Sequence, residues 1–274
     1  MGKSFSCFGI VHGMIVLTAF LTSCEDVIPV NLQDTAPRIV IEGNISNLVD
    51  SVSIYLHKST DFFKPSGIVP VTGATVHISD PQGKSYLLTD DGDGKYTAGD
   101  FQAEYDELYS LDVTAEGKQY KAASRMPEPV KIDSLIFRKE PGDPRDNQIV
   151  LYIKDPAGID NYYQVKLTRN DSLPENDNQF VLYSDKYFDG RSTNLAINIR
   201  RFGISHFERN DTVKVWLISL EKMIYDYYRV LHDITDKDNT LSGSTPSNPP
   251  NNLSNGALGY FTASSASEIT VVVK

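Results

Sequence analysis

Four consecutive residues near the start of the chain have the types and the order needed for lipid attachment. An aliphatic residue, Leu21, and two small residues, Thr22 and Ser23, directly precede Cys24. This order is the pattern of a bacterial lipobox. The small side chains fit the narrow site of the peptidase that cleaves before the cysteine. The sequence therefore predicts that the Cys24 thiol carries a diacylglycerol thioether and becomes the mature N-terminus.

The segment before this motif has the composition of a secretory signal. A mostly apolar stretch runs from Phe8 to Phe20 behind the charged residue Lys3, and such a stretch is too short to span a bilayer. We therefore interpret residues 1–23 as a lipoprotein signal peptide. The alternative is an ordinary signal whose cleavage site happens to lie near a cysteine.

Cysteine content and net charge indicate which covalent links and which binding partners the mature chain can have. The chain has two cysteines, and Cys7 lies in the segment to be removed, so no disulfide is possible within the mature chain. The formal net charge is −10 at pH 7, which argues against nucleic acid and against adsorption to acidic headgroups. Anchoring is therefore expected from the lipid, and two or three acyl chains are enough for it.

The rest of the sequence offers no recognisable catalytic constellation. It contains no HExxH, GxSxG, Walker A or GxGxxG pattern, and its acidic residues are scattered. The predicted mature chain has four histidines, none with a close second histidine: His57, His77, His206 and His232. We expect a protein that is not an enzyme, with no catalytic residue, no cofactor and no metal site.

The stretch "TDDGDGKY" resembles a calcium loop only superficially. Asp91 and Asp93 alternate, but Lys95 stands where a third oxygen ligand is needed and Gln102 stands in place of the final glutamate. Asp-Gly between two strands is a strong hairpin signal. The sequence therefore favours a hairpin turn here.

Alternation of apolar and polar residues dominates the mature chain. Four segments show this period of two, which is typical of strands with one buried face, and turn signals separate them. Their apolar positions include Val52, Ile54 and Leu56; Ala74, Val76 and Ile78; Tyr109, Leu111 and Val113; and Leu195, Ile197 and Ile199. We predict an all-β protein that begins with an immunoglobulin-like sandwich.

The two prolines of "MPEP", residues 126–129, predict a stiff joint between domains. The expected organisation is a tether over 24–37, an immunoglobulin-like sandwich over 38–126, and a second β-rich domain over 130–274. The sequence identifies no ligand-binding residues. It favours the Asn-, Pro- and Ser-rich stretch 236–256 as the place for a ligand, because loops of this length are often functional.

One amphipathic helix is predicted near 220–234 within the second domain. Its apolar positions follow helical spacing: Leu220, Met223, Ile224, Tyr227, Tyr228 and Leu231. Ser219 is the expected N-cap. The tyrosines are interpreted as packing the helix onto a sheet, and the alternative is a surface on which a ligand stacks.

Seven segments, in this order, resemble one family of lipoproteins from Bacteroidota, called domain of unknown function 4249. They cover nearly the whole mature chain: "SCEDVIPVNL", "VTGATVHISD", "GKYTAGDF", "YSLDVTAEGKQYKAASRMPEPVKIDSL", "DPAGIDNYY", "NDTVKVWLISLEKMIYDYYRVL" and "NPPNNLSNGALGYFTASS". The resemblance implies an all-β fold with an immunoglobulin-like N-terminal part. It also implies a gene that often neighbours a TonB-dependent transporter, and it carries no catalytic residues.

Two further features resemble signals of Bacteroidota lipoproteins. Glu25 and Asp26, directly after Cys24, resemble an export signal to the cell surface; the alternative is a solvated tether. Thr35 and Ser172 follow aspartates in the manner of an O-glycosylation sequon, although Asp-Ser and Asp-Thr also occur as plain turn residues.

These features together predict an outer-membrane lipoprotein, lipid-anchored and facing the cell exterior. Its expected role is that of a non-enzymatic accessory, in ligand capture or gating, to a TonB-dependent transporter. The alternative is a structural or adhesive β-sandwich protein of the cell surface. An immunoglobulin-like fold does not separate the two, because fold does not determine function.

Overall fold

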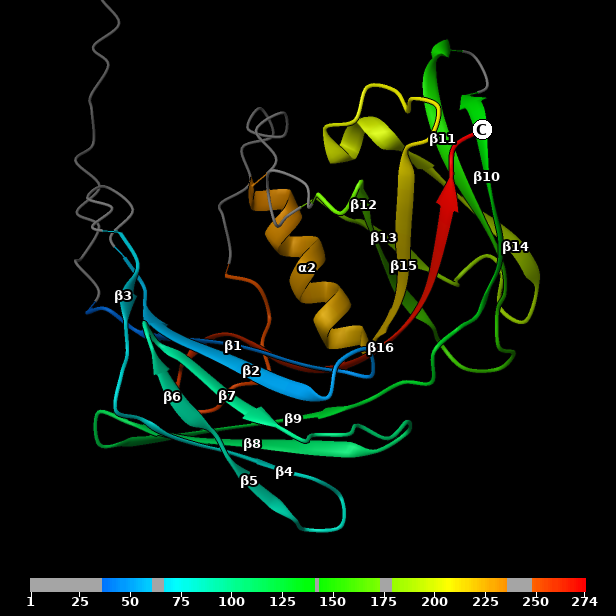
Figure 1. Cartoon of the computed structure of the whole chain (residues 1–274). Coiled ribbons are helices and arrows are strands. Elements are labelled where there is room, and N and C mark those ends of the chain that lie inside the picture. The colour runs from blue at the N-terminus through cyan, green and yellow to red at the C-terminus, as the bar shows by residue number, and fades with distance from the viewer. Residues whose placement is uncertain (1–35, 61–66, 141–142, 173–178, 236–247) are drawn as a thin grey trace, which may run out of the picture. The chain divides into compact units, whose positions relative to one another are not determined.

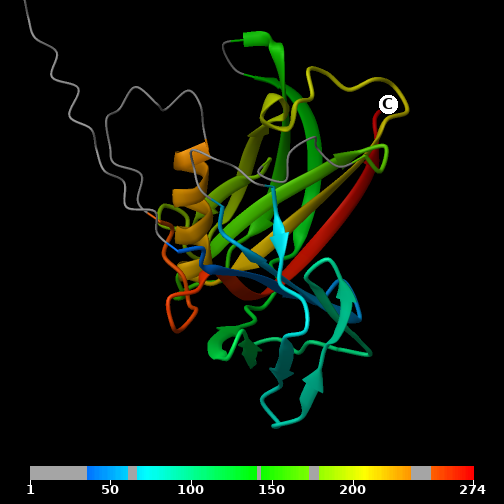
Figure 2. The ribbon, with the colours of Figure 1, turned by 90° about the vertical axis from the view of Figure 1, so that its left-hand side faces the viewer.

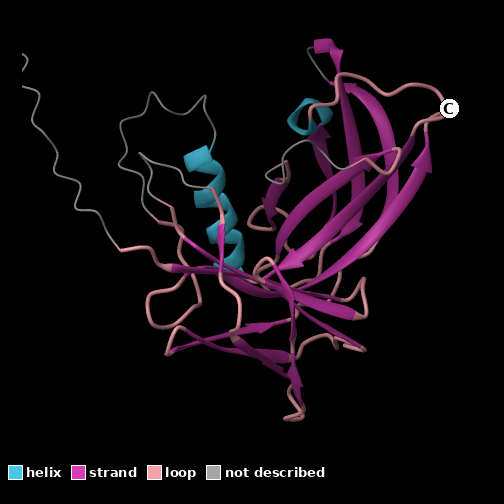
Figure 3. Cartoon of the chain, turned by 60° about the vertical axis from the view of Figure 1, so that its left-hand side comes forward, coloured by secondary structure: helices cyan, strands magenta, loops and turns pink. Residues whose placement is uncertain are grey.

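A computed structural model describes residues 36–60, 67–140, 143–172, 179–235 and 248–274. Residues 37–274 form one compact unit, built largely of strands (Figures 1 and 3). The all-β prediction is therefore confirmed. The signal peptide and nearly all of the tether lie outside the described residues.

The N-terminal sandwich packs two layers of strands around one core. One layer contains β1 (Ile39–Ser46), β2 (Ser51–Lys58), β3 (Val69–Pro70), β6 (Thr89–Gly92) and β7 (Lys95–Gly99). The facing layer contains β4 (Thr75–Ser79), β5 (Ser85–Leu87), β8 (Leu108–Ala115) and β9 (Lys118–Arg125). The predicted alternation holds in β2 and β8, whose predicted apolar positions all lie in this core: Val52, Ile54 and Leu56, and Tyr109, Leu111 and Val113.

A second sandwich follows the joint. Its smaller sheet contains β10 (Ile132–Glu140), β11 (Asp143–Lys154) and β14 (Ser192–Asn198), and a 3-10 helix (Ile199–Phe202) follows β14. Its other layer contains β12 (Tyr162–Arg169), β13 (Val181–Ser184), β15 (Thr212–Leu220) and part of β16 (Leu258–Val272). Leu195, Ile197 and Ile199 lie in this second core as their spacing predicts.

The last strand, β16, belongs to both sandwiches. Its first half pairs parallel to β1 and its second half pairs antiparallel to β15, so one sheet continues from the first sandwich into the second (Figure 1). Phe261 and Ala263 consequently lie in the first core, although they fall within the second predicted domain, 130–274. The chain therefore passes between the two sandwiches twice. The first passage is the joint at 126–129, and the second is the continuous strand β16.

The helix α2 (Lys222–Thr235) lies beside the strands of the long sheet (Figures 1 and 2). Ile224 and Tyr227 are buried, and the Tyr227 ring lies 4.9 Å from that of Tyr260 on β16. Tyr228 is partly buried, with its ring 5.3 Å from Phe180. The rings pack the helix onto the protein, as the spacing predicted.

The predicted cap of this helix was wrong. Ser219 is still part of β15, which ends only at Leu220, and Leu220 is itself buried. The first helical hydrogen bond is accepted by the Glu221 carbonyl from the Tyr225 N–H. Burial of Leu220 extends the strand by a residue beyond the serine, so the serine cannot adopt the cap position. Among the described residues, no helix has the length and apolar content to cross a membrane.

Candidate functional site

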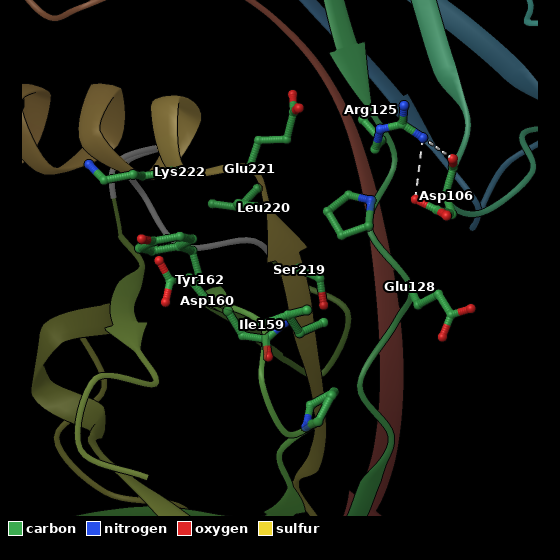
Figure 4. Close-up of a pocket in the computed structure, with 13 residues that line it drawn as sticks. Asp106, Arg125, Glu128, Ile159, Asp160, Tyr162, Ser219, Leu220, Glu221 and Lys222 are labelled. Carbon is green, nitrogen blue, oxygen red and sulfur yellow. Dashed lines mark hydrogen bonds and ion pairs between the residues drawn. The ribbon is translucent and has the colours of Figure 1, made fainter. Parts of the chain in front are cut away.

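A hollow that could hold a ligand lies at the joint between the two sandwiches (Figure 4). Four segments line it: the connection before β8, the end of β9 with the following prolyl segment, the β11–β12 connection with the start of β12, and the junction of β15 with α2. Its volume is about 570 Å³, within the usual range of small-molecule sites. The lining residues are Asp106, Arg125, Pro127, Glu128, Pro156, Ile159, Asp160, Asn161, Tyr162, Ser219, Leu220, Glu221 and Lys222.

The local sequence explains why two of these segments, the prolyl segment after β9 and the β11–β12 connection, lie outside the sheets. The prolines of "MPEP" restrict the backbone and remove N–H donors, so the chain leaves β9 without joining a sheet until β10. The connection from β11 turns at Gly158, whose φ of 80° suits glycine. Its N–H donates to Asp189 over 2.8 Å. These constraints hold the rim of the cleft apart.

Both cations of the cleft already have acidic partners. Arg125 forms an ion pair with Asp106 at 3.3 Å, and Lys222 forms one with Asp226 at 2.5 Å. The acids are less completely paired. Glu221 accepts a hydrogen bond of 2.5 Å from the Ser124 hydroxyl and has no ion pair with a described residue.

Two more carboxylates of the cleft have no partner among the described residues. Glu128 and Asp160 are exposed, and neither forms a hydrogen bond or an ion pair with any described residue. Figure 4 shows them on opposite sides of the opening. The cleft is therefore electronegative once its internal ion pairs are formed.

Two buried oxygens at this cleft also lack partners within the described structure. They are Ser219 Oγ and Asn161 Oδ1. Ser219 is only 2% exposed, and its side chain points into the space between Ile159 and Glu128 (Figure 4). A buried polar group without a hydrogen bond costs about 1–3 kcal/mol, so a ligand or water that supplied one would be held here.

The apolar part of the lining comes from Pro127, Ile159 and Tyr162. Ile159 is 58% exposed, and the Tyr162 ring is held by Tyr225 of α2 at 5.0 Å. Burial raises the pKa of the Tyr162 hydroxyl, and the nearby Asp160 carboxylate raises it further. The phenol therefore stays neutral at physiological pH and offers a ring face and an O–H donor.

A second group of acids lies behind the β11–β12 connection. Asp155, Asp185 and Asp189 bring carboxylate oxygens within 4.8 Å of one another, a grouping that spacing in the sequence does not reveal. Burial and the neighbouring acids raise the pKa of Asp185. These carboxylates accept hydrogen bonds from nearby backbone N–H groups. Asp185 accepts one from Asn161 at 2.7 Å, and Asp155 accepts one from Gly190 at 3.0 Å. These bonds anchor the connection that forms one wall of the cleft.

A smaller hollow of about 400 Å³ lies between β13, β14 and α2, with Arg201, Arg229 and His232 in its lining. Arg229 reaches Asp226 at 3.7 Å and Asp233 at 3.8 Å. This hollow lacks the buried, unpartnered serine that distinguishes the cleft at the joint.

Most site residues predicted from sequence lie outside the described residues. These are the lipidation residue Cys24, the export signal Glu25 and Asp26, and the glycosylation candidate Thr35. Ser172 is described and lies exposed in a turn, where its N–H donates to the Arg169 carbonyl over 3.0 Å. Such a position is open to modification.

The stretch "TDDGDGKY" is a hairpin, as the sequence favoured. Gly92 pairs with Lys95, and both residues of the two-residue loop have positive φ, 52° for Asp93 and 74° for Gly94. That is the conformation of a type I′ turn. Asp91 accepts a hydrogen bond of 2.7 Å from the Thr97 hydroxyl, which ties the hairpin together.

The cleft itself was missed by sequence reasoning, which favoured 236–256 as the place for a ligand; residues 236–247 of that stretch are not described. The sequence does contain two features that mark segments of the cleft. One is the break in strand periodicity at 126–129, and the other is the change from strand to helix after Ser219. Neither feature shows which other segment it faces.

Comparison with known proteins places the chain in context. A family model described as "Domain of unknown function (DUF4249)" matches residues 25–270. No curated protein matches the sequence.

Similar solved structures include a two-domain fibronectin type-III segment of chicken tenascin, with a TM-score of 0.23, 12% identity, and coverage of 67% of this chain and 91% of that one. Another is the BSP domain of a biofilm-associated protein, with a TM-score of 0.24, 12% identity, and coverage of 66% of this chain and 26% of that one. Superpositions at this level carry no inference about function.

Proposed function

The chain belongs to the family described as domain of unknown function 4249, and from this premise we propose that it is a non-enzymatic, ligand-binding lipoprotein of the outer membrane. The lipobox at residues 21–24 supports attachment through Cys24. Glu25 and Asp26 support display on the cell exterior. The anchor would hold the β-sandwich unit close to the membrane through a short tether.

The observation that carries the binding role is the cleft at the joint, where Ser219 is buried and its hydroxyl lacks a partner among the described residues. A folded protein rarely keeps such a group in a recess of this size unless something else bonds to it. The expected context is capture or gating for a TonB-dependent transporter. That partner rests on the family resemblance.

A structural or adhesive role at the cell surface is the second candidate. The observation in its favour is the continuous strand β16, which is hydrogen-bonded in both sandwiches. Pulling the sandwiches apart would require breaking ladder hydrogen bonds of β16, which suits a protein that bears load. The same construction would also keep a binding cleft rigid, so it is compatible with both roles.

Purification from native membranes tests these proposals together. Wild-type protein should label with fatty acid and fractionate with membranes, whereas Cys24→Ser should do neither. Unchanged labelling of Cys24→Ser would overturn the lipoprotein proposal.

The same preparation separates the two roles. A TonB-dependent transporter that co-purifies with the wild type would support the accessory role. Retention on matrix polymers without any transporter would support the adhesive role instead. Protection from protease added to intact cells, while a known surface protein is cut, would contradict display on the exterior.

A further inference from the structure

The chemistry of the cleft specifies its ligand more narrowly than its shape does. Once Arg125 is paired with Asp106 and Lys222 with Asp226, three carboxylates remain without an ion pair to a described residue. They are Glu128, Asp160 and Glu221. Anions would meet this surplus of negative charge and be repelled, whereas a cation would neutralise it.

The unsatisfied hydrogen-bonding groups point the same way. Asn161 Oδ1 is an acceptor only, and the free carboxylates are acceptors only. Ser219 Oγ can accept or donate. A ligand that satisfies all of them must therefore bring several donors and few acceptors. Ammonium and guanidinium groups have that property, because they carry donors and no acceptor.

The apolar lining indicates the chemistry of the uncharged part of the ligand. Ile159 is 58% exposed, and Tyr162 lies with it in the lining (Figure 4). Pro127 adds to the same lining. An aliphatic or aromatic body placed on these side chains would remove apolar surface from water. It could also set a cation near the Tyr162 ring.

We infer that the cleft at the joint binds an organic cation, an ammonium or guanidinium group carried on an apolar body, with Glu128 and Asp160 supplying negative charge at its rim and Ser219 accepting one of its N–H groups. This inference rests on the proposed binding function and names the ligand class of the same cleft. A basic side chain of a peptide and a small free amine share this chemistry.

A matched set of probes tests the ligand class. Benzylamine, benzyl alcohol and benzoate share one ring and differ in charge, and each is titrated against the full mature protein in detergent, with binding followed by calorimetry and ligand-observed NMR. Benzylamine should bind at least about tenfold more tightly than benzyl alcohol, the factor that corresponds to ~1.4 kcal/mol. Benzoate should not bind, and added salt should weaken the binding of benzylamine.

Lysine amide and a peptide with an internal lysine between apolar residues separate the two sources of the cation. Tighter binding of the peptide assigns the cleft to peptides, and tighter binding of the free amine assigns it to small metabolites. Either result supports the inference.

Charge-removing variants locate the binding. The double variant Glu128→Gln/Asp160→Asn keeps the shape of both exposed side chains, so its melting temperature should equal that of wild type. Its affinity for benzylamine should fall by at least about tenfold. The matched control, Asp50→Asn/Asp133→Asn, removes two exposed carboxylates outside the cleft and should bind as wild type does.

Ser219→Ala tests the buried hydroxyl. Because this buried oxygen has no partner among the described residues, its removal relieves an unpaired polar group and should not lower the melting temperature of the free protein. It should weaken the binding of benzylamine several-fold.

Three results would overturn the inference: benzyl alcohol binding as tightly as benzylamine, both double variants weakening benzylamine equally, or no probe binding at millimolar concentration. The first would leave a binding cleft in place and refute only the cationic ligand, so the proposed function would survive it.

Discussion

The hydroxyl of Tyr163 on β12 donates a hydrogen bond of 2.5 Å to Oδ1 of Asp155, and both residues are buried. Asp155 then accepts the Gly190 N–H with its other oxygen. Together the two bonds tie the β11–β12 connection, one wall of the cleft, to the second core. Burial and this carboxylate raise the pKa of Tyr163 far above its usual range, so the phenol remains a donor.

We predict that Tyr163→Phe lowers the free energy of unfolding by about 1–3 kcal/mol, because a buried carboxylate oxygen loses its donor. Urea unfolding at pH 7 measures the change. Tyr152→Phe removes a hydroxyl from a residue that is 37% exposed and should shift stability by less than about 0.5 kcal/mol. Equal effects of the two variants would contradict the role assigned to Asp155.

The aromatic face of α2, formed by Tyr227 and Tyr228, gives a second prediction. Tyr227 is buried against Tyr260, so Tyr227→Ala should destabilise the protein by about 3–5 kcal/mol. Tyr228→Ala should lower the melting temperature by less, because Tyr228 is only partly buried. If Tyr228→Ala melted like wild type yet lost binding of a ligand, the aromatic face of α2 would be a binding surface rather than a packing surface.

The parallel pairing of β1 with β16 requires a glycine. Gly259 has φ of 92°, and a Cβ there would lie 2.1 Å from the Ile41 carbonyl oxygen. Gly259→Ala should therefore cost at least about 2 kcal/mol in strain, measured by thermal or urea unfolding. Gly99→Ala, where a Cβ would meet nothing within 4 Å, is the matched control. A small effect at Gly259 would mean that the two strands pair differently.

Stability at acid pH depends on Asp211. Its pKa is held below the usual range first by the Glu208 N–H, and also by the side chains of Asn170 and Arg169, the latter at 2.7 Å. A carboxylate with a lowered pKa in the folded state stabilises the fold above its unfolded pKa, about 3.9. That contribution is lost as pH falls through the folded pKa.

We therefore expect wild type to lose stability as pH falls below about 4, and Asp211→Asn to lose less over the same interval. Urea unfolding at a series of pH values measures both slopes. Asp133→Asn, a change on the exposed surface of β10, is the control. Parallel slopes for Asp211→Asn and wild type would refute the assignment.

The predicted O-glycosylation of Ser172 can be tested by mass spectrometry of the purified protein. The residue is exposed in a turn, so Ser172→Ala should remove one sugar chain from protein purified from its native source, and Thr35→Ala should remove another. Thr212→Ala should remove none, because Thr212 follows the buried Asp211 and lies in β15. An unchanged mass for Ser172→Ala would show that the sequon is a plain turn.

Local patterns in the sequence determined a good part of this protein. Strand alternation placed Val52, Ile54 and Leu56 in a core, because a period of two leaves only one face to bury. Asp93 and Gly94 specified a type I′ turn through their tolerance of positive φ. The helical spacing of Ile224 and Tyr227 specified a packed face. The predicted lipobox would need no fold, since the peptidase for such motifs recognises a linear sequence.

Tertiary structure decided the rest. Alternation says that a strand has a buried face but not which strand it pairs with, so the parallel pairing of β16 with β1 was invisible in the sequence. Ser219 has the chemistry of a helix cap, yet burial of Leu220 keeps it in β15 and turns its hydroxyl into the cleft. The cleft joins Glu128, Asp160 and Ser219 from three distant segments, because only packing of the two sandwiches brings their ends together.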